Sequence, residues 1–208
     1  MSQKKLKIIV FSDYICPFCY IGFYRVEQLK ENFDIEVEWR PFEIHPETPK
    51  EGTELKNLPF PKEYLEMMMS NIVKLADDVG ITLKLTDKLP NSRLALYFSE
   101  FARQKGKFDE FHKLVFDAYW KDGQDIGNQD FLLSIAESIG FKRSEILEYI
   151  DSEEPYEELK KSLRELRKYG INGVPTFIIG DRIVVGAQPY EVFENVIRIG
   201  LETDPVLL

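Results

Sequence analysis

The pattern of apolar and polar residues near the start of the chain predicts a strand, a helix and a second strand. Residues 7–11 are nearly all apolar and β-branched, as in a strand buried on both faces of a sheet. Apolar positions then recur at helical spacing from residue 16 to residue 33, and Pro17 suits a first helical turn. Residues 35–40 alternate apolar and charged side chains and stop at Pro41. This order predicts one parallel crossover unit.

The central part of the chain, from about residue 43 to about residue 165, predicts helices and no clear strand. Glycines stand close to the ends of five helical segments, as C-terminal stop signals should. Only the stretch 81–85 is ambiguous. The predicted helices are residues 62–79, 92–104, 108–121, 129–139, 144–150 and 156–169, and the glycines are Gly80, Gly106, Gly123, Gly140 and Gly170.

The last part of the chain returns to strand patterns. Residues 175–179 and 182–186 are rich in β-branched residues and flank the turn Gly180-Asp181, which predicts a tight antiparallel hairpin. A final helix is predicted from about residue 189 to residue 200. The chain therefore belongs to the α/β class, with a helical segment between its two groups of strands.

Composition and charge narrow the class of protein. Among 208 residues, 44% are hydrophobic and 30% are charged, which is enough apolar surface for a sizeable core. The net charge of −9 has the wrong sign for binding nucleic acid or an anionic membrane surface. No segment resembles a secretory signal or a membrane helix, so we expect a cytoplasmic protein, in which structural disulfides are rare.

The two cysteines of the chain, Cys16 and Cys19, form a Cys-x-x-Cys motif at the start of the first helix. The helix N-terminus favours negative charge, so we expect Cys16 to be partly a thiolate and to act as the nucleophile. Cys19 lies one turn deeper, where it can close or resolve a disulfide. A zinc site would need two further ligands, and the two histidines, His45 and His112, are isolated in sequence. We therefore predict a redox pair and no metal.

A second signal lies far along the chain, at Val174-Pro175. A proline directly before a strand and preceded by Gly-Val is a candidate for a cis peptide bond. A cis bond would leave the main chain of Val174 beside the cysteines, where an extended substrate could pair with it. We therefore predict Val174 and Pro175 as substrate-binding residues.

Four segments resemble the FrnE-like branch of the DsbA family: FSDYICPFCYIG (11–22), RPFEIHPE (40–47), GVPTF (173–177) and IVVGAQ (183–188). The resemblance runs essentially from end to end. It implies a thioredoxin fold with a large all-helical insertion, the redox pair Cys16 and Cys19, and a cis-proline at Pro175. The family usually has Trp where Phe18 stands. His45 stands where the family more often has Asn, and we assign it no role.

The resemblance also suggests a division of the chain. Residues 1–42 and 166–208 would form the thioredoxin-like domain, and residues 43–165 the helical insertion domain. The length of the chain, which falls between a typical one-domain and a typical two-domain protein, fits one domain split by an insertion.

Related members of the superfamily leave an alternative function open. Kappa-class glutathione transferases and 2-hydroxychromene-2-carboxylate isomerases are similar to this scaffold but use a lone Ser or Cys with glutathione. We expect a thiol-disulfide oxidoreductase without a bound cofactor, acting on protein or peptide disulfides or on low-molecular-weight thiols. The alternatives are a glutathione-dependent transferase or isomerase, and a binding or chaperone protein in which the cysteines only form a redox-sensitive clasp.

Several other residues near the motif have two interpretations. Pro17, Phe18 and Tyr14 are predicted to line a hydrophobic substrate groove above the cysteines. Asp13 either accepts a proton from Cys19 during resolution or caps the loop before the helix. His112 lies beside the apolar face of a predicted helix, so we expect a packed side chain.

Overall fold

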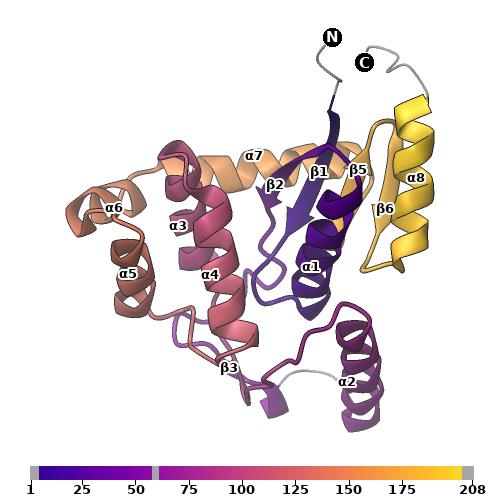
Figure 1. The fold of residues 1–208 in the computed structure, drawn as a ribbon. Helices are drawn as coiled ribbons and strands as arrows, with labels where there is room; N and C mark the ends of the chain where they lie inside the picture. Colours follow the sequence, from indigo (N-terminus) through magenta and orange to yellow (C-terminus); the bar gives the residue numbers. More distant parts are fainter. Residues whose placement is uncertain (1–4, 58–60, 203–208) are drawn as a thin grey trace.

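A mixed four-stranded sheet organises the first and last parts of the chain in the computed structural model, which describes residues 5–57 and 61–202 (Figure 1). β1 (Leu6–Ser12) runs parallel to β2 (Ile35–Pro41), and α1 (Pro17–Asn32) connects them. β5 (Thr176–Ile179) is antiparallel to β1 and forms a hairpin with β6 (Arg182–Val185), which gives the order β2-β1-β5-β6. The predicted crossover unit and the predicted hairpin are both confirmed.

Both faces of β1 are covered by helices. Ile8 and Val10 belong to the main core beneath α1, whereas Phe11 packs with Leu166 on the opposite face. α1 and α8 (Tyr190–Glu202) cover the first face, and α7 (Glu154–Lys168) runs across the second, behind the sheet in Figure 1. The almost wholly apolar sequence of β1 follows from this double burial.

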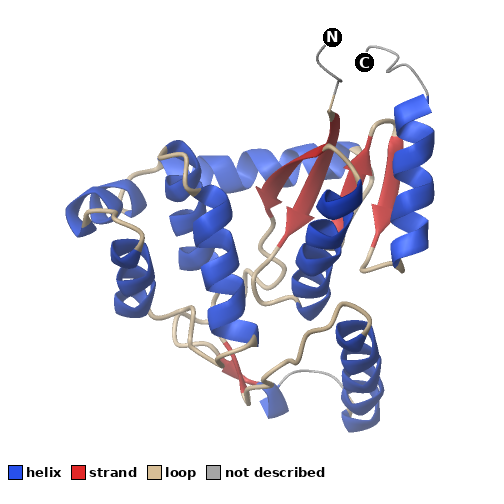
Figure 2. Cartoon of the chain, viewed as in Figure 1, coloured by secondary structure: helices blue, strands red, loops and turns tan. Residues whose placement is uncertain are grey.

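Five helices occupy the segment between the two groups of strands. The last four gather beside the sheet and form the helical half of the molecule, whereas the first lies apart from them and packs on α1 (Figure 2). Each begins and ends within two residues of its predicted bounds. Gly80, Gly106, Gly123, Gly140 and Gly170 follow helix ends with positive φ, as stop signals do. The five helices are α2 (Lys62–Asp77), α3 (Arg93–Gln104), α4 (Phe108–Trp120), α5 (Gln129–Ser138) and α6 (Arg143–Ile150).

The predicted helical insertion is confirmed, and it also contains two short strands that the sequence did not predict. β3 (Thr53–Glu54) pairs with β4 (Lys88–Leu89) in a small antiparallel ladder, and Leu55–Asn57 forms one turn of 3-10 helix. The ambiguous residues 81–85 are not a strand. Strands of two residues are too short to show an alternating pattern, which is why the sequence did not reveal them.

The proposed boundary at residues 165 and 166 falls inside α7 rather than between elements. The end of this helix packs on the sheet through Leu166, which contacts the cluster of Phe11 and Ile178. α7 thus joins the helical half to the sheet as one continuous element. Among the described residues, no helix is long and apolar enough to cross a membrane.

Candidate active site

Cys16 occupies the N-cap position of α1, and Pro17 is the first residue of the helix. The Cys16 side chain makes no capping hydrogen bond, and the first turn of α1 contains no acidic residue. No carboxylate within the first turn therefore offsets the positive end of the helix dipole at the Cys16 sulfur. Both cysteines are free thiols, with Cys16 5% exposed and Cys19 fully buried.

The two thiols differ in their surroundings. Burial raises the pKa of the Cys19 thiol well above its usual range, and its hydrogen bond to Cys16 raises it further. The Asp13 main chain and the Ser12 side chain oppose this rise. Cys19 therefore holds its proton and can share it with Cys16. The two thiols are therefore not equivalent, and the roles of attacking and resolving cysteine stay a prediction.

The main chain of Val174 lies directly against Cys16. The Cys16 Sγ atom donates to the Val174 carbonyl oxygen at 3.6 Å, although 158 positions separate the two residues. The Val174–Pro175 peptide bond is cis, and Pro175 is buried while Val174 is partly exposed. The predicted juxtaposition of this dipeptide and the cysteines is therefore present in the structure.

Close packing of α1 against the strand after Pro175 keeps this juxtaposition in place. A Cβ atom at Gly22 would lie 3.0 Å from the Phe177 Cζ atom and 3.5 Å from the Pro175 Cγ atom. A side chain at residue 22 would therefore have to displace the Phe177 ring by a few tenths of an ångström. The absence of a side chain on one helical residue thus allows the Val174–Pro175 loop to approach Cys16.

Pro17 and Phe18, which the sequence predicts as groove residues, lie next to Cys16 at the start of α1. Both are partly exposed. Phe18 also packs against a second apolar cluster, in which α2 contributes Ile72 and Ala76 and α1 contributes Ile21. α2 therefore packs beside the Cys-x-x-Cys motif.

Tyr14 does not line a groove, and this part of the prediction is wrong. Its side chain is 1% exposed, and its hydroxyl lies 2.8 Å from the His112 Nδ1 atom. Its carbonyl oxygen accepts a hydrogen bond from Trp120 Nε1 at 2.8 Å. The helical half covers the loop before Cys16 and turns the ring inward, which the local sequence does not show.

Asp13 ties the loop before α1 to the chain that follows β2. Its carboxylate accepts hydrogen bonds from the main-chain N–H groups of Ile44 at 2.7 Å and Ile15 at 3.4 Å. Burial raises the pKa of Asp13 to about 6, and these bonds only partly oppose the rise. The contacts support the interpretation of Asp13 as a loop cap.

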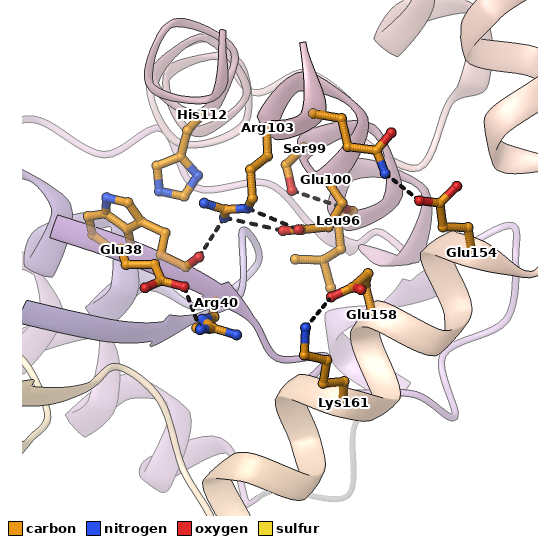
Figure 3. Close-up of polar contacts among 12 residues, drawn as sticks. Glu38, Arg40, Leu96, Ser99, Glu100, Arg103, His112, Glu154, Glu158 and Lys161 are labelled. Atoms are coloured by element: carbon orange, nitrogen blue, oxygen red, sulfur yellow. Dashed lines mark hydrogen bonds and ion pairs between the residues drawn. The ribbon is translucent and has the colours of Figure 1, made fainter. Parts of the chain in front are cut away.

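The two histidines have different environments. His45 is partly exposed and contacts Glu47. His112 is buried among aromatic rings that include Trp39 and Phe116, as expected for a packed residue. Figure 3 shows His112 and Arg103 directed toward β2, the strand that carries Glu38 and Arg40.

Ser12 is the residue near the cysteines that sequence reasoning missed. It is buried, and its side chain lowers the pKa of the Cys19 thiol, against the larger effect of burial. The signal was present in the alternation of β1, because Ser12 follows Ile8 and Val10 on the face beneath α1.

Comparisons with known proteins identify the family of the chain. The family of DSBA-like thioredoxin domains matches residues 7–198. The uncharacterized protein YwbO of Bacillus subtilis is 33% identical over 193 residues, which cover 91% of this chain and 94% of that protein. A 2-hydroxychromene-2-carboxylate isomerase of a Pseudomonas species is 20% identical over 188 residues, covering 89% and 87%.

A solved structure shows the same fold over nearly the whole chain. The crystal structure of a probable DsbA oxidoreductase from Streptomyces coelicolor has a TM-score of 0.86 at 23% identity, and the match covers 98% of this chain and 93% of that one. The match spans both the sheet and the helical insertion. With residues 7–198 matching the family, the chain belongs to the DSBA-like thioredoxin domains.

Proposed function

We propose that this protein is a thiol-disulfide oxidoreductase in which Cys16 is the nucleophile and Cys19 is the resolving thiol. The observation that carries the proposal is the position of Cys16, at an uncompensated helix N-terminus and in contact with a buried thiol that keeps its proton. The positive helix end at Cys16 and the protonated state of Cys19 favour nucleophilic attack by the Cys16 sulfur rather than by the Cys19 sulfur.

In the reductive direction the Cys16 thiolate attacks one sulfur of a substrate disulfide. A Cys16–substrate disulfide forms, and the second substrate sulfur leaves as a thiolate. The Cys19 sulfur then attacks the Cys16 sulfur, which forms the Cys16–Cys19 disulfide, and the Cys19 proton ends on the released substrate thiol. Two electrons pass to the substrate, and the oxidative direction is the reverse.

The main chain around Val174 gives the substrate a place to bind. Its carbonyl oxygen lies at the Cys16 sulfur, and Pro17 and Phe18 provide partly exposed apolar surface beside it. An extended segment of a protein or peptide could hydrogen-bond this main chain while its own sulfur meets Cys16. We expect protein and peptide disulfides or low-molecular-weight thiols as substrates, in the cytoplasm.

The test is to trap the mixed disulfide. Cys19→Ser should accumulate a covalent adduct with a model disulfide peptide, because nothing resolves it. Cys16→Ser should form none and should lose dithiol-dependent insulin reduction. A Cys16→Ser variant with wild-type exchange rates would refute the proposal. Equilibration with glutathione redox buffers would then give the reduction potential, and with it the direction of the reaction.

A glutathione-dependent isomerase or transferase is the second candidate, because a relative carries the name 2-hydroxychromene-2-carboxylate isomerase. Such an enzyme would bind glutathione at Cys16 without needing Cys19. Calorimetry with glutathione separates the two functions. Tight, non-covalent binding that survives Cys19→Ser would favour the isomerase or transferase, and the absence of binding would exclude it.

A further inference from the structure

β6 is an edge strand of the four-stranded sheet, at the opposite end from β2 (Figure 1). Among the described residues no other strand pairs with its outer side. The Gly186 N–H group donates to the Pro175 carbonyl oxygen at 2.8 Å, so the main chain of Gly186 faces inward, toward β5. Main-chain groups alternate between the two sides of an antiparallel strand. The N–H and C=O groups of Ile183 and Val185 therefore point outward, away from β5.

Ile183 and Val185 also carry exposed apolar side chains. Ile183 is 43% exposed and Val185 is 52% exposed, whereas Val184 between them is 6% exposed. Ile183 lies opposite Ile178 in the ladder, so its side chain is on the same face of the sheet as α7. α7 contacts β2, at the far end of this face, and the apolar side chains of β6 remain exposed to solvent.

α8 presents an uncharged side to the same edge from the other face of the sheet. Its Arg198 side chain lies over the Phe33 ring, just after α1, and pairs with Glu194. This charged side of α8 therefore faces α1. Helical spacing puts Val192 and Val196 on the other side of α8, toward β6, and Val192 is 38% exposed. The β6 surface, as we name it, comprises Ile183, Val185, Val192 and Val196.

The edge formed by β2 is closed, in contrast. The Arg103 side chain of α3 donates to the Trp39 carbonyl oxygen on this strand, and Figure 3 shows Arg103 directed toward β2. α7 also contacts β2. Proteins protect sheet edges with covering helices, charges or prolines, and β6 has no charge or proline from residue 183 to residue 185. Within residues 5–57 and 61–202, β6 is therefore the one open edge of the four-stranded sheet.

We propose that β6 pairs with β6 of a second copy of this chain, antiparallel and across a two-fold axis at Val184. Because the main-chain groups of Ile183 and Val185 point outward, the register puts Ile183 opposite Val185 of the second copy. Val184 then lies opposite Val184 of the second copy. The same contacts form on both strands, as two-fold symmetry requires, and every outward N–H and C=O group of Ile183 and Val185 gains a partner.

A second copy is the occupant that the charges favour. The chain carries a net charge of −9, so two copies repel each other across most of their surfaces. The β6 surface contains no ionisable side chain, and Arg182 at its end pairs with Asp181 of the same chain at 3.8 Å. Two such surfaces can therefore meet without bringing like charges together. Because pairing uses the one open edge, the assembly stops at two copies.

This pairing keeps the two cysteine sites apart. Gly186 binds Pro175 just past the end of β6, so Cys16 lies beyond the C-terminal end of this strand. Antiparallel pairing reverses the second strand and puts its cysteines at the opposite end of the joined sheet. Both sites stay clear of the interface, and the inference does not rest on the proposed function.

Light scattering during size-exclusion chromatography, under reducing conditions, gives the mass of the full chain in solution. The wild type should have twice the chain mass of 24.4 kDa at micromolar concentrations. Val185→Pro removes an outward N–H group and leaves the inner ladder with β5 in place, so this variant should have the mass of one chain. Val185→Thr is the matched control. It keeps the N–H group and the β-branched shape and should remain a dimer.

Disulfide trapping checks the register. In a background of Cys16→Ser and Cys19→Ser, Val184→Cys should give a covalent dimer on mild oxidation, because facing Cα atoms in a non-hydrogen-bonded pair lie about 4.5 Å apart. Ile183→Cys is the control. Two residues at this position would lie diagonally, about 7–8 Å apart, which is too far for a disulfide. It should form no covalent dimer, although Ile183 is the more exposed residue.

Hydrogen exchange adds a readout at the edge itself. The Ile183 amide should exchange slowly in the wild type and quickly in the single-chain Val185→Pro variant. A wild type with the mass of one chain at every concentration would overturn the inference and leave the β6 surface to a peptide segment of another protein. Equal trapping of the two cysteine variants would also overturn it. If Val185→Pro does not fold, the trapping experiment decides alone, because it keeps the outward main-chain groups.

Discussion

Gly22 and Phe177 approach so closely that a Cβ atom on Gly22 would lie 3.0 Å from the Phe177 Cζ atom. This contact sets how near the Cys-x-x-Cys helix lies to the strand that follows Pro175. Because Val174 contacts Cys16 through its carbonyl oxygen, the spacing of the helix and the strand also sets the geometry of the site.

Gly22→Ala should therefore weaken the site more than a typical helical substitution. The new methyl group must push Phe177 or the Pro175 ring aside, at a cost of about 1–3 kcal/mol, while the better helix propensity of alanine returns about 1 kcal/mol. We expect a net loss of about 1 kcal/mol in urea unfolding and slower reaction of Cys16 with a disulfide reagent.

Gly173→Ala is the control for this prediction. It adds the same methyl group to the Val174 loop, where a Cβ atom would meet nothing within 4 Å. Its stability should stay within about 0.5 kcal/mol of the wild type. Equal effects of the two substitutions on Cys16 reactivity would show that the packing of Gly22 does not set the geometry.

Residues whose position follows from local pattern were predicted correctly. The helix start at Cys16 follows from a strand pattern, a proline and helical spacing within one short stretch. The contact between Cys16 and Val174 was predicted because two motifs far apart suggested one site. Tyr14 was misplaced because its direction depends on His112 and Trp120, which the helical insertion brings to it. No pattern around Tyr14 carries that information.

Asp117 on α4 should hold α1 in place. Its carboxylate accepts hydrogen bonds from the Tyr20 hydroxyl at 2.8 Å and the Tyr24 hydroxyl at 3.0 Å, and it pairs with Lys113. Asp117→Ala leaves the hydroxyl of the 1% exposed Tyr20 without its acceptor. We expect a loss of about 2–3 kcal/mol in the free energy of unfolding.

Lys113→Ala removes the ion pair but keeps the tyrosine hydrogen bonds to Asp117, so it distinguishes their contributions to stability. The Lys113 side chain is 54% exposed, so its loss should cost less than about 1 kcal/mol. Thermal and urea unfolding of both variants check this. If the two variants lose the same stability, the tyrosine contacts contribute nothing and the prediction is wrong.

Trp120 should stabilise the loop that leads into Cys16. Its Nε1–H donates to the Tyr14 carbonyl oxygen at 2.8 Å in a buried setting. Trp120→Phe removes the donor and leaves the carbonyl group unpaired, at a cost of about 1–3 kcal/mol. Hydrogen exchange should speed up in the loop of residues 13–15, whereas Tyr119→Phe on the same helix should leave that loop protected.

Asp13 should make the stability of the fold depend on pH. Burial raises its pKa from 3.8 to about 6, so the folded state binds a proton more tightly than the unfolded state does. The stabilisation from the protonated carboxyl is fully present below pH 3.8 and is lost as pH rises through about 6. The difference of about two pKa units corresponds to ~3 kcal/mol at most.

Asp13→Asn removes this titration and keeps an oxygen that accepts from the Ile44 N–H group. Relative to this variant, the wild type should lose up to ~3 kcal/mol between about pH 4 and pH 7 in urea unfolding. Asp34→Asn, which alters an exposed ion pair with Lys5, should follow the wild-type curve within about 1 kcal/mol. A group with the same pKa in the folded and unfolded states cannot make stability depend on pH. If the free energy of unfolding changes with pH in the same way in the wild type and in Asp13→Asn, the burial of Asp13 does not govern the pH dependence.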